Sequence, residues 1–123
     1  MKRFACSIFT AAALLPWAAQ AADDHKPQHG GVVVETKAAD LELVAKPDSL
    51  TVHFSDHGKP MTVASATGKA TVYNGKEKTE AALALVGGKL EAKGSFKIAT
   101  GTKVLVEAAL NGKPPVSARF TLK

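Results

Sequence analysis

The chain has 123 residues, of which 46% are hydrophobic, and a formal net charge of +5 from 16 lysines and arginines against 11 aspartates and glutamates. This length and apolar content suffice for one small hydrophobic core and exclude a second one. Because the single cysteine is Cys6, the rest of the chain offers no disulfide framework, zinc–thiolate site or cysteine nucleophile.

Residues 1–21 have the features of a secretory signal peptide. A short basic head, Met1 to Arg3, precedes an apolar run from Phe4 to Trp17. This run is shorter than the about 20 residues that cross a bilayer, which disfavours the alternative of an uncleaved anchor. Ala19 and Ala21 supply the small residues that a signal peptidase accepts, so we expect cleavage before Ala22. The sequence therefore predicts a periplasmic protein with no membrane insertion after cleavage.

The exported chain is only mildly basic. Loss of Lys2 and Arg3 leaves 14 basic and 11 acidic residues, a net charge of +3. The lysines are spread along the chain and are not gathered with aromatic residues, so the sequence does not predict nucleic-acid binding.

Residues 22–30 are polar, contain Pro27 and show no periodicity, which is typical of a mobile tail. This tail carries His25 and His29. Cleavage one residue later than expected would give an amino-terminal Asp-Asp-His sequence ending at His25, which can chelate Cu(II) or Ni(II) in a square plane. With cleavage before Ala22, polarity alone explains His25.

From Gly31 onward, apolar and polar residues alternate, as in strands with one buried face. We predict strands at 32–36, 40–45, 49–55, 61–65, 68–73, 76–86, 89–98, 103–110 and 116–122. Turn residues separate them about every ten positions. The predicted fold of residues 31–123 is an all-β, small antiparallel β-sandwich of the immunoglobulin-like or cupredoxin-like kind.

Two turns fix the register of neighbouring predicted strands. A two-residue turn at Gly87-Gly88 pairs Leu85 with Leu90, so the apolar faces of both strands coincide. This match favours a strand over a helix for the Ala- and Leu-rich segment 81–86. Asn74-Gly75 predicts a second two-residue turn, followed by a strand that begins at Lys76.

The histidines are the main candidates for chemistry. By alternation from its neighbours, His53 lies on the outward face of its strand. Residues 56–59 form the predicted turn after it, and we expect this turn to bring His57 back towards His53. His29 is the expected third ligand, and Asp56 is a candidate oxygen donor. The bland alternative for His53 and His57 is a pair of solvent-exposed residues with no ligand.

Imidazole and carboxylate donors suit Cu(II), Zn(II) or Ni(II), and the absence of thiolates disfavours a sealed structural zinc site. We therefore expect an open site for an exchangeable ion, with copper the leading candidate and zinc or nickel the alternatives. A thioether from Met61 would favour copper. However, Met61 faces Phe54 across the predicted hairpin, which favours a role in the core.

Two short segments carry a resemblance to known proteins. Around residues 29–33 and 56–60, the chain resembles the small periplasmic sandwich proteins and domains of bacterial heavy-metal efflux systems, including amino-terminal extensions of some adaptor subunits. The similarity runs over about 29 to 123. Residues 50–55, with the later Gly-Lys-Pro turn, are similar to copper-resistance periplasmic sandwiches. Those carry an amino-terminal His and a later Asp-x-His, whereas this chain has no Asp-x-His.

Two functions compete on this basis. The first is a periplasmic metal-binding accessory protein that passes an ion to an efflux adaptor or another periplasmic partner. The second is a non-enzymatic envelope scaffold, whose exposed strand edge docks a partner and whose histidines are incidental. We expect no enzyme, because the sequence has no nucleophile elbow, phosphate-binding glycine loop or His-Glu-x-x-His motif.

Overall fold

A computed structural model describes residues 26–123 of the chain. The predicted signal peptide, its cleavage point and His25 lie outside these residues. The described part is built from strands and contains no helix. The strands are β1 (Val32–Glu35), β2 (Asp40–Lys46), β3 (Ser49–Asp56), β4 (Lys59–Pro60), β5 (Ala66–Asn74), β6 (Glu77–Val86), β7 (Lys89–Lys93), β8 (Lys103–Leu110) and β9 (Val116–Thr121).

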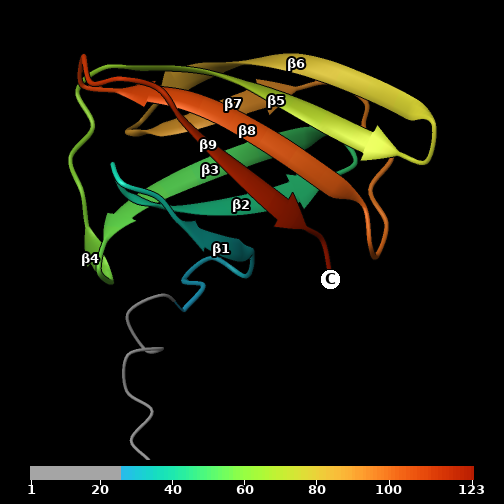
Figure 1. Cartoon of the computed structure of the whole chain (residues 1–123), viewed down its shortest axis with the longest axis horizontal. Coiled ribbons are helices and arrows are strands. Elements are labelled where there is room, and N and C mark those ends of the chain that lie inside the picture. The colour runs from blue at the N-terminus through green and yellow to red at the C-terminus, as the bar shows by residue number, and fades with distance from the viewer. Residues whose placement is uncertain (1–25) are drawn as a thin grey trace, which may run out of the picture.

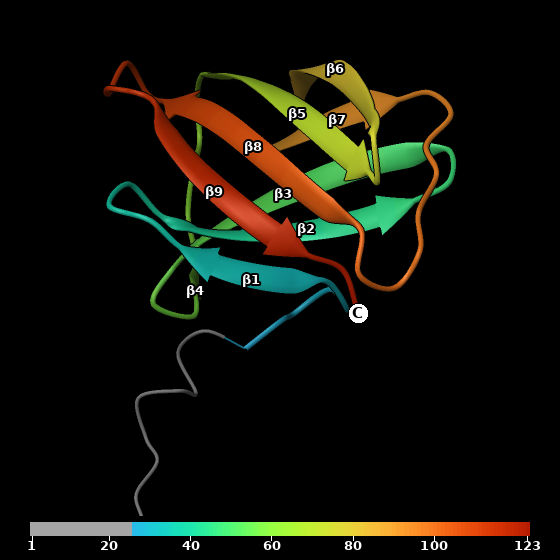
Figure 2. The same cartoon turned by 45° about the vertical axis from the view of Figure 1, so that its right-hand side comes forward.

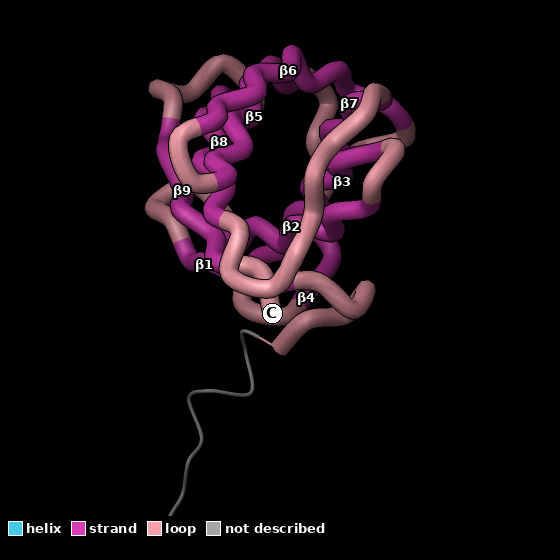
Figure 3. Tube along the Cα trace, turned by 90° about the vertical axis from the view of Figure 1, so that its right-hand side faces the viewer, coloured by secondary structure: helices cyan, strands magenta, loops and turns pink. Residues whose placement is uncertain are grey.

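The strands form an antiparallel sheet in the order β1-β2-β3-β7-β6-β5-β8-β9, and β4 pairs with the end of β3. Strands β5, β6 and β7 follow one another, and β8 returns to lie beside β5, which is the Greek-key arrangement. The sheet curls back on itself, as Figure 1 shows, until its edge strands β1 and β9 lie side by side without pairing (Figures 2 and 3). The predicted all-β, antiparallel sandwich-like fold is confirmed.

The core fills the space that this curled sheet encloses. Alternate residues of each strand point inward, as the period of two requires. Strand β8 shows the rule most clearly, because Val104, Val106, Ala108 and Leu110 are buried and the residues between them are not. The largest fully buried side chains are Phe120, Leu41, Leu43, Leu50, Leu90, Leu110, Val52, Val72, Val104 and Val106.

The structure confirms one predicted hairpin and corrects the other. Leu85 pairs with Leu90, and Gly87 and Gly88 both have positive φ, as a two-residue type I′ turn needs. In the other hairpin, Asn74 pairs with Glu77, so the turn lies at Gly75-Lys76, one residue later than predicted. Asn74 is held in its strand because its side chain donates to the carbonyl of Lys97 and accepts from the Thr102 hydroxyl.

The predicted strand at 61–65 is wrong. Beyond β4, this segment is irregular and connects β4 to β5. The amides of Ala64 and Ser65 donate to the Asn111 side chain, at 3.0 and 3.3 Å, and Ser65 in turn accepts from the Asn111 amide. The segment's hydrogen bonds therefore go to the β8–β9 turn and not to a neighbouring strand.

Candidate functional site

The site begins with the register between β2 and β3. A two-residue turn at Pro47-Asp48 pairs Lys46 with Ser49, and the same register sets Glu42 opposite His53. Both residues point to the outward side of the sheet, away from the buried Leu41 and Val52. Glu42 is nevertheless only 5% exposed. Gln28, His29 and Gly31, just before β1, donate hydrogen bonds to its carboxylate.

Glu42 fastens these preceding residues to the sheet. Its Oε1 accepts hydrogen bonds from the Gln28 amide at 3.0 Å and from His29 Nδ1 at 2.9 Å. Its Oε2 accepts from the amides of His29 and Gly31, each at 2.8 Å. We call these four contacts the Glu42 clasp. Four donors on one buried carboxylate satisfy the charge that burial would otherwise destabilise.

The clasp sets the ionisation of Glu42. Burial alone raises the pKa of this carboxyl, but the hydrogen bonds from His29, Gly31 and Gln28 outweigh it and hold the pKa below its ordinary value. Glu42 is therefore an anion at neutral pH, and an anion only accepts hydrogen bonds. It follows that Nδ1 of His29 carries the proton, and when the ring is neutral its Nε2 has a free lone pair.

His29 and His53 form a stacked pair. Their ring centroids are 3.7 Å apart and the ring planes differ by 4°. Burial lowers the pKa of His53, and the neighbouring His29 and Lys89 lower it further, against an opposing effect of Glu42. The His53 ring therefore gives up its proton more readily than an unperturbed imidazole, and the neutral ring offers a lone pair.

A shallow pocket of about 410 Å³ opens over this pair. Its other walls come from the hairpin turn at Gly87-Gly88, from Lys89 and from Pro60 of β4. Gln28 also lines it and donates its side-chain amide to the Gly58 carbonyl at 3.0 Å. This bond ties the residues preceding β1 to the tip of the β3–β4 hairpin, where the other predicted ligands lie.

The predicted ligands Asp56 and His57 lie at the end of β3 and in the turn after it, whereas His29 and His53 form the stacked pair. Strand β3 stays extended through Asp56, which lies about 10 Å along the strand from His53. His57 and Gly58 form a two-residue turn with φ of +50° and +84°. His57 Nε2 lies 3.7 Å from the Asp56 carboxylate, and both side chains are 71% exposed. The ring that contacts His53 is thus that of His29.

Met61 is half-buried and packs against the core cluster. Within residues 26–123, no group of three or more histidine, cysteine, aspartate or glutamate side chains is arranged to hold a metal ion. The arrangement at His29 and His53 therefore offers two imidazole ligands, with a carboxylate behind one of them.

Sequence reasoning missed Glu42. The signal was present, because the two-residue turn at Pro47-Asp48 sets Glu42 opposite His53 by the same arithmetic that paired Leu85 with Leu90. The stacking of His29 on His53 had no such signal, since His29 precedes the first strand and no register fixes it.

No protein-family model, curated protein or solved structure matches this chain. In the part of the chain that the structure describes, no helix is long and apolar enough to cross a membrane.

Proposed function

We propose that this protein is an exported metal-binding accessory protein that holds an exchangeable transition-metal ion, with copper the first candidate, on His29 and His53. The stacked pair carries the proposal, because it brings two imidazoles together at the mouth of an open pocket. Imidazole is a common ligand for copper, zinc and nickel.

The hydrogen bonding of His29 supports this proposal. Metal-binding histidines usually donate their second ring nitrogen to a carboxylate or carbonyl group, which orients the ring and makes it a better ligand. Glu42 is placed to do this for His29 through the 2.9 Å contact to Nδ1. The lowered pKa of His53 supports it too, because an ion competes there with a proton that is held less tightly.

The stacking predicts an exchangeable ion. A ring nitrogen donates in the plane of its own ring, so two parallel rings 3.7 Å apart do not aim at one ion. At least one ring must turn before both ligate, and this rearrangement lowers the affinity. Water, a partner's side chain, or His57 and Asp56 from the adjacent hairpin would complete the coordination. Such a site suits capture and transfer to an efflux adaptor or another periplasmic partner.

The test is isothermal titration of the tag-free protein with Cu(II) and Zn(II) in a non-chelating buffer at pH 7. We expect His29→Ala and His53→Ala each to lower the affinity by about tenfold or more, and Glu42→Gln to lower it by about tenfold through the lost orientation of His29. His25→Ala is the control, because an amino-terminal chelate would depend on that residue.

Imidazole NMR shifts recorded during the titration assign the ligands. Shifts at His29 and His53 support the proposal, and a further shift at His57 adds the hairpin ligand. The absence of binding heat with both metals would contradict it. So would an affinity that survives the double variant His29→Ala/His53→Ala but is lost in His25→Ala.

A further inference from the structure

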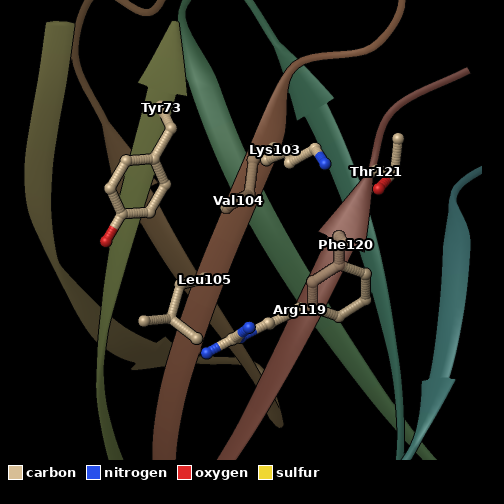
Figure 4. Close-up of a pocket in the computed structure, with 7 residues that line it drawn as sticks. All are labelled: Tyr73, Lys103, Val104, Leu105, Arg119, Phe120 and Thr121. Atoms are coloured by element: carbon tan, nitrogen blue, oxygen red, sulfur yellow. The ribbon is translucent and has the colours of Figure 1, made fainter. Parts of the chain in front are cut away.

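A second surface feature lies away from the histidines, on the outward face of β5, β8 and β9. In the sheet register, Tyr73 is opposite Lys103, Lys103 is opposite Thr121, and Leu105 is opposite Arg119. These five side chains line a hollow of about 380 Å³, shown in Figure 4, and we call them the Arg119 patch. Figure 4 shows the Arg119 guanidinium reaching towards Leu105.

The patch combines apolar surface with positive charge. Tyr73 is 39% exposed, and only it and Val86 are exposed among the large hydrophobic side chains of residues 26–123. Leu105 is half-buried beside it. A tyrosine ring and a leucine offer a ligand an apolar contact area, while the cations at the rim fix its orientation.

Among residues 26–123, the cations of the patch have no carboxylate partner. Elsewhere on the described surface, Lys69 pairs with Glu80, Lys93 with Glu91 and Lys97 with Glu77, at 3.7, 3.9 and 3.1 Å. No acidic side chain of the described residues lies within ion-pair distance of Lys103 or Arg119. Lys78 of β6, opposite Tyr73, extends this positive region.

We propose that the Arg119 patch binds an acidic peptide segment of a partner protein. Arginine presents a planar fork that can bond a carboxylate through two parallel hydrogen bonds. A second carboxylate of the segment would meet Lys103, and an apolar side chain between the two acids would pack on Tyr73 and Leu105.

A peptide fits the flanks of the patch better than a flat anionic membrane does. Glu107 lies on the same outward face, two residues along β8 from Leu105, and Glu80 lies one strand away opposite Thr71. A membrane surface would meet these carboxylates together with the cations, whereas a narrow peptide can follow the cations alone.

Tyr73 is the only tyrosine of the 123 residues, so its ring is a unique NMR reporter for the patch. With ring-¹³C-labelled tyrosine in the whole chain, we would titrate an acetylated hexapeptide of alternating glutamate and leucine. We expect saturable shifts of the Tyr73 ring and none with the same peptide carrying glutamine for glutamate. Raised salt should weaken the binding, because the contacts are exposed charges.

Arg119→Gln/Lys103→Gln should lower the peptide affinity by about tenfold or more. The matched control is Lys46→Gln/Lys93→Gln, which removes the same charge from exposed positions on β2 and β7. Equal losses in both variants would overturn the proposal, as would saturation of the Tyr73 shifts by phosphate or citrate at the same concentration. Binding to phosphatidylglycerol vesicles but not to the peptide would assign the patch to a membrane instead.

Discussion

Glu42 shows how much one side chain can organise. It is one of four polar or charged residues buried in the described part of the chain, with Asp40, Thr71 and Thr102. Its carboxylate accepts three backbone amides and one imidazole. Because a charged acceptor with four donors is stronger than a neutral one, the clasp depends on the charge of Glu42 as well as on its shape.

Glu42→Gln tests this dependence directly. The substitution keeps the size of the side chain but replaces one acceptor oxygen with an NH2 group, which is a donor. The groups that donated to that oxygen then have no acceptor. We expect a loss of about 2 kcal/mol in the free energy of unfolding. Urea denaturation measures it. The control Glu77→Gln removes an exposed ion pair with Lys97, and we expect it to cost less than about 1 kcal/mol.

For single residues, the sequence predicted the positions that follow from the alternation of apolar and polar residues in a strand. It left open the contacts that depend on loops. His53 lies opposite Glu42 on the outward side because Val52 and Phe54 fill the inward side. The contact of His29 with His53 depends on the bonds that hold the residues before β1 to Glu42 of β2. The alternation of apolar and polar residues does not predict such a contact. The setting of His57 depends on the turn geometry, with φ of +50° at that residue.

The residues from Gln28 to Gly31 act as one element, because the clasp holds them together. Gly31 is required there, since a Cβ at this position would overlap the backbone carbonyl of Leu43. The element therefore depends on both a charge on β2 and the close approach of a glycine to the same strand.

Acidification should weaken this element. The folded-state pKa of His53 lies below the ordinary 6.5, and that of Glu42 lies below 4.5. The unfolded chain therefore binds more protons, so stability falls as pH falls. The contribution of His53 is complete above pH 6.5 and is lost as pH drops through its folded pKa. That of Glu42 is lost later, below about pH 4.5.

Urea midpoints measured from pH 8 to pH 4 check this prediction. We expect the midpoint to decline below pH 6.5, and His53→Ala to flatten the first part of the decline. Val86→Ala changes an exposed side chain that does not titrate, so the urea midpoint should depend on pH as in the wild type. A midpoint that rises on acidification would contradict the sign of both shifts.

Gly31→Ala should open the same element without changing any charge. The added methyl group would push the chain away from Leu43 and break the Gly31 amide bond to Glu42. We expect hydrogen exchange of the His29 and Gly31 amides to accelerate by about tenfold or more, which corresponds to about 1.4 kcal/mol of lost protection. Gly94→Ala, where the nearest atom is a Phe96 ring carbon at 3.3 Å, should leave this exchange unchanged.

Most strands were predictable because their hydrogen bonds and their buried faces follow one periodicity. The exceptions are segments whose backbone bonds go elsewhere. Residues 61–65 bond to Asn111, and residues 94–96, predicted as part of a strand, bond to Pro47 and Asp48 in the turn after β2. These partners are distant in sequence, so no local pattern of residues predicts them.

The whole molecule depends on one core, closed by the curled sheet. Phe120 is 1% exposed and belongs to the edge strand β9, so it joins the end of the sheet to the core. We expect Phe120→Ala to lower the free energy of unfolding by about 3 to 5 kcal/mol, from the lost burial and the cavity left behind. Thermal and urea unfolding measure it, and Val86→Ala, at 48% exposure, is the surface control with an expected change within about 0.5 kcal/mol.

Because β1 and β9 lie side by side at the two ends of the sheet, the strands can be connected in a different order. Gly30, Gly31 and Lys123 line the same small hollow, and Figure 2 shows the last residue beside the start of β1. A short glycine–serine linker could join these two positions, while new ends are opened at the exposed Gly87-Gly88 turn. The resulting circular permutant would keep every strand pair, because β6 and β7 remain neighbours without their turn, but it would leave out His29 and so lose the stacked pair.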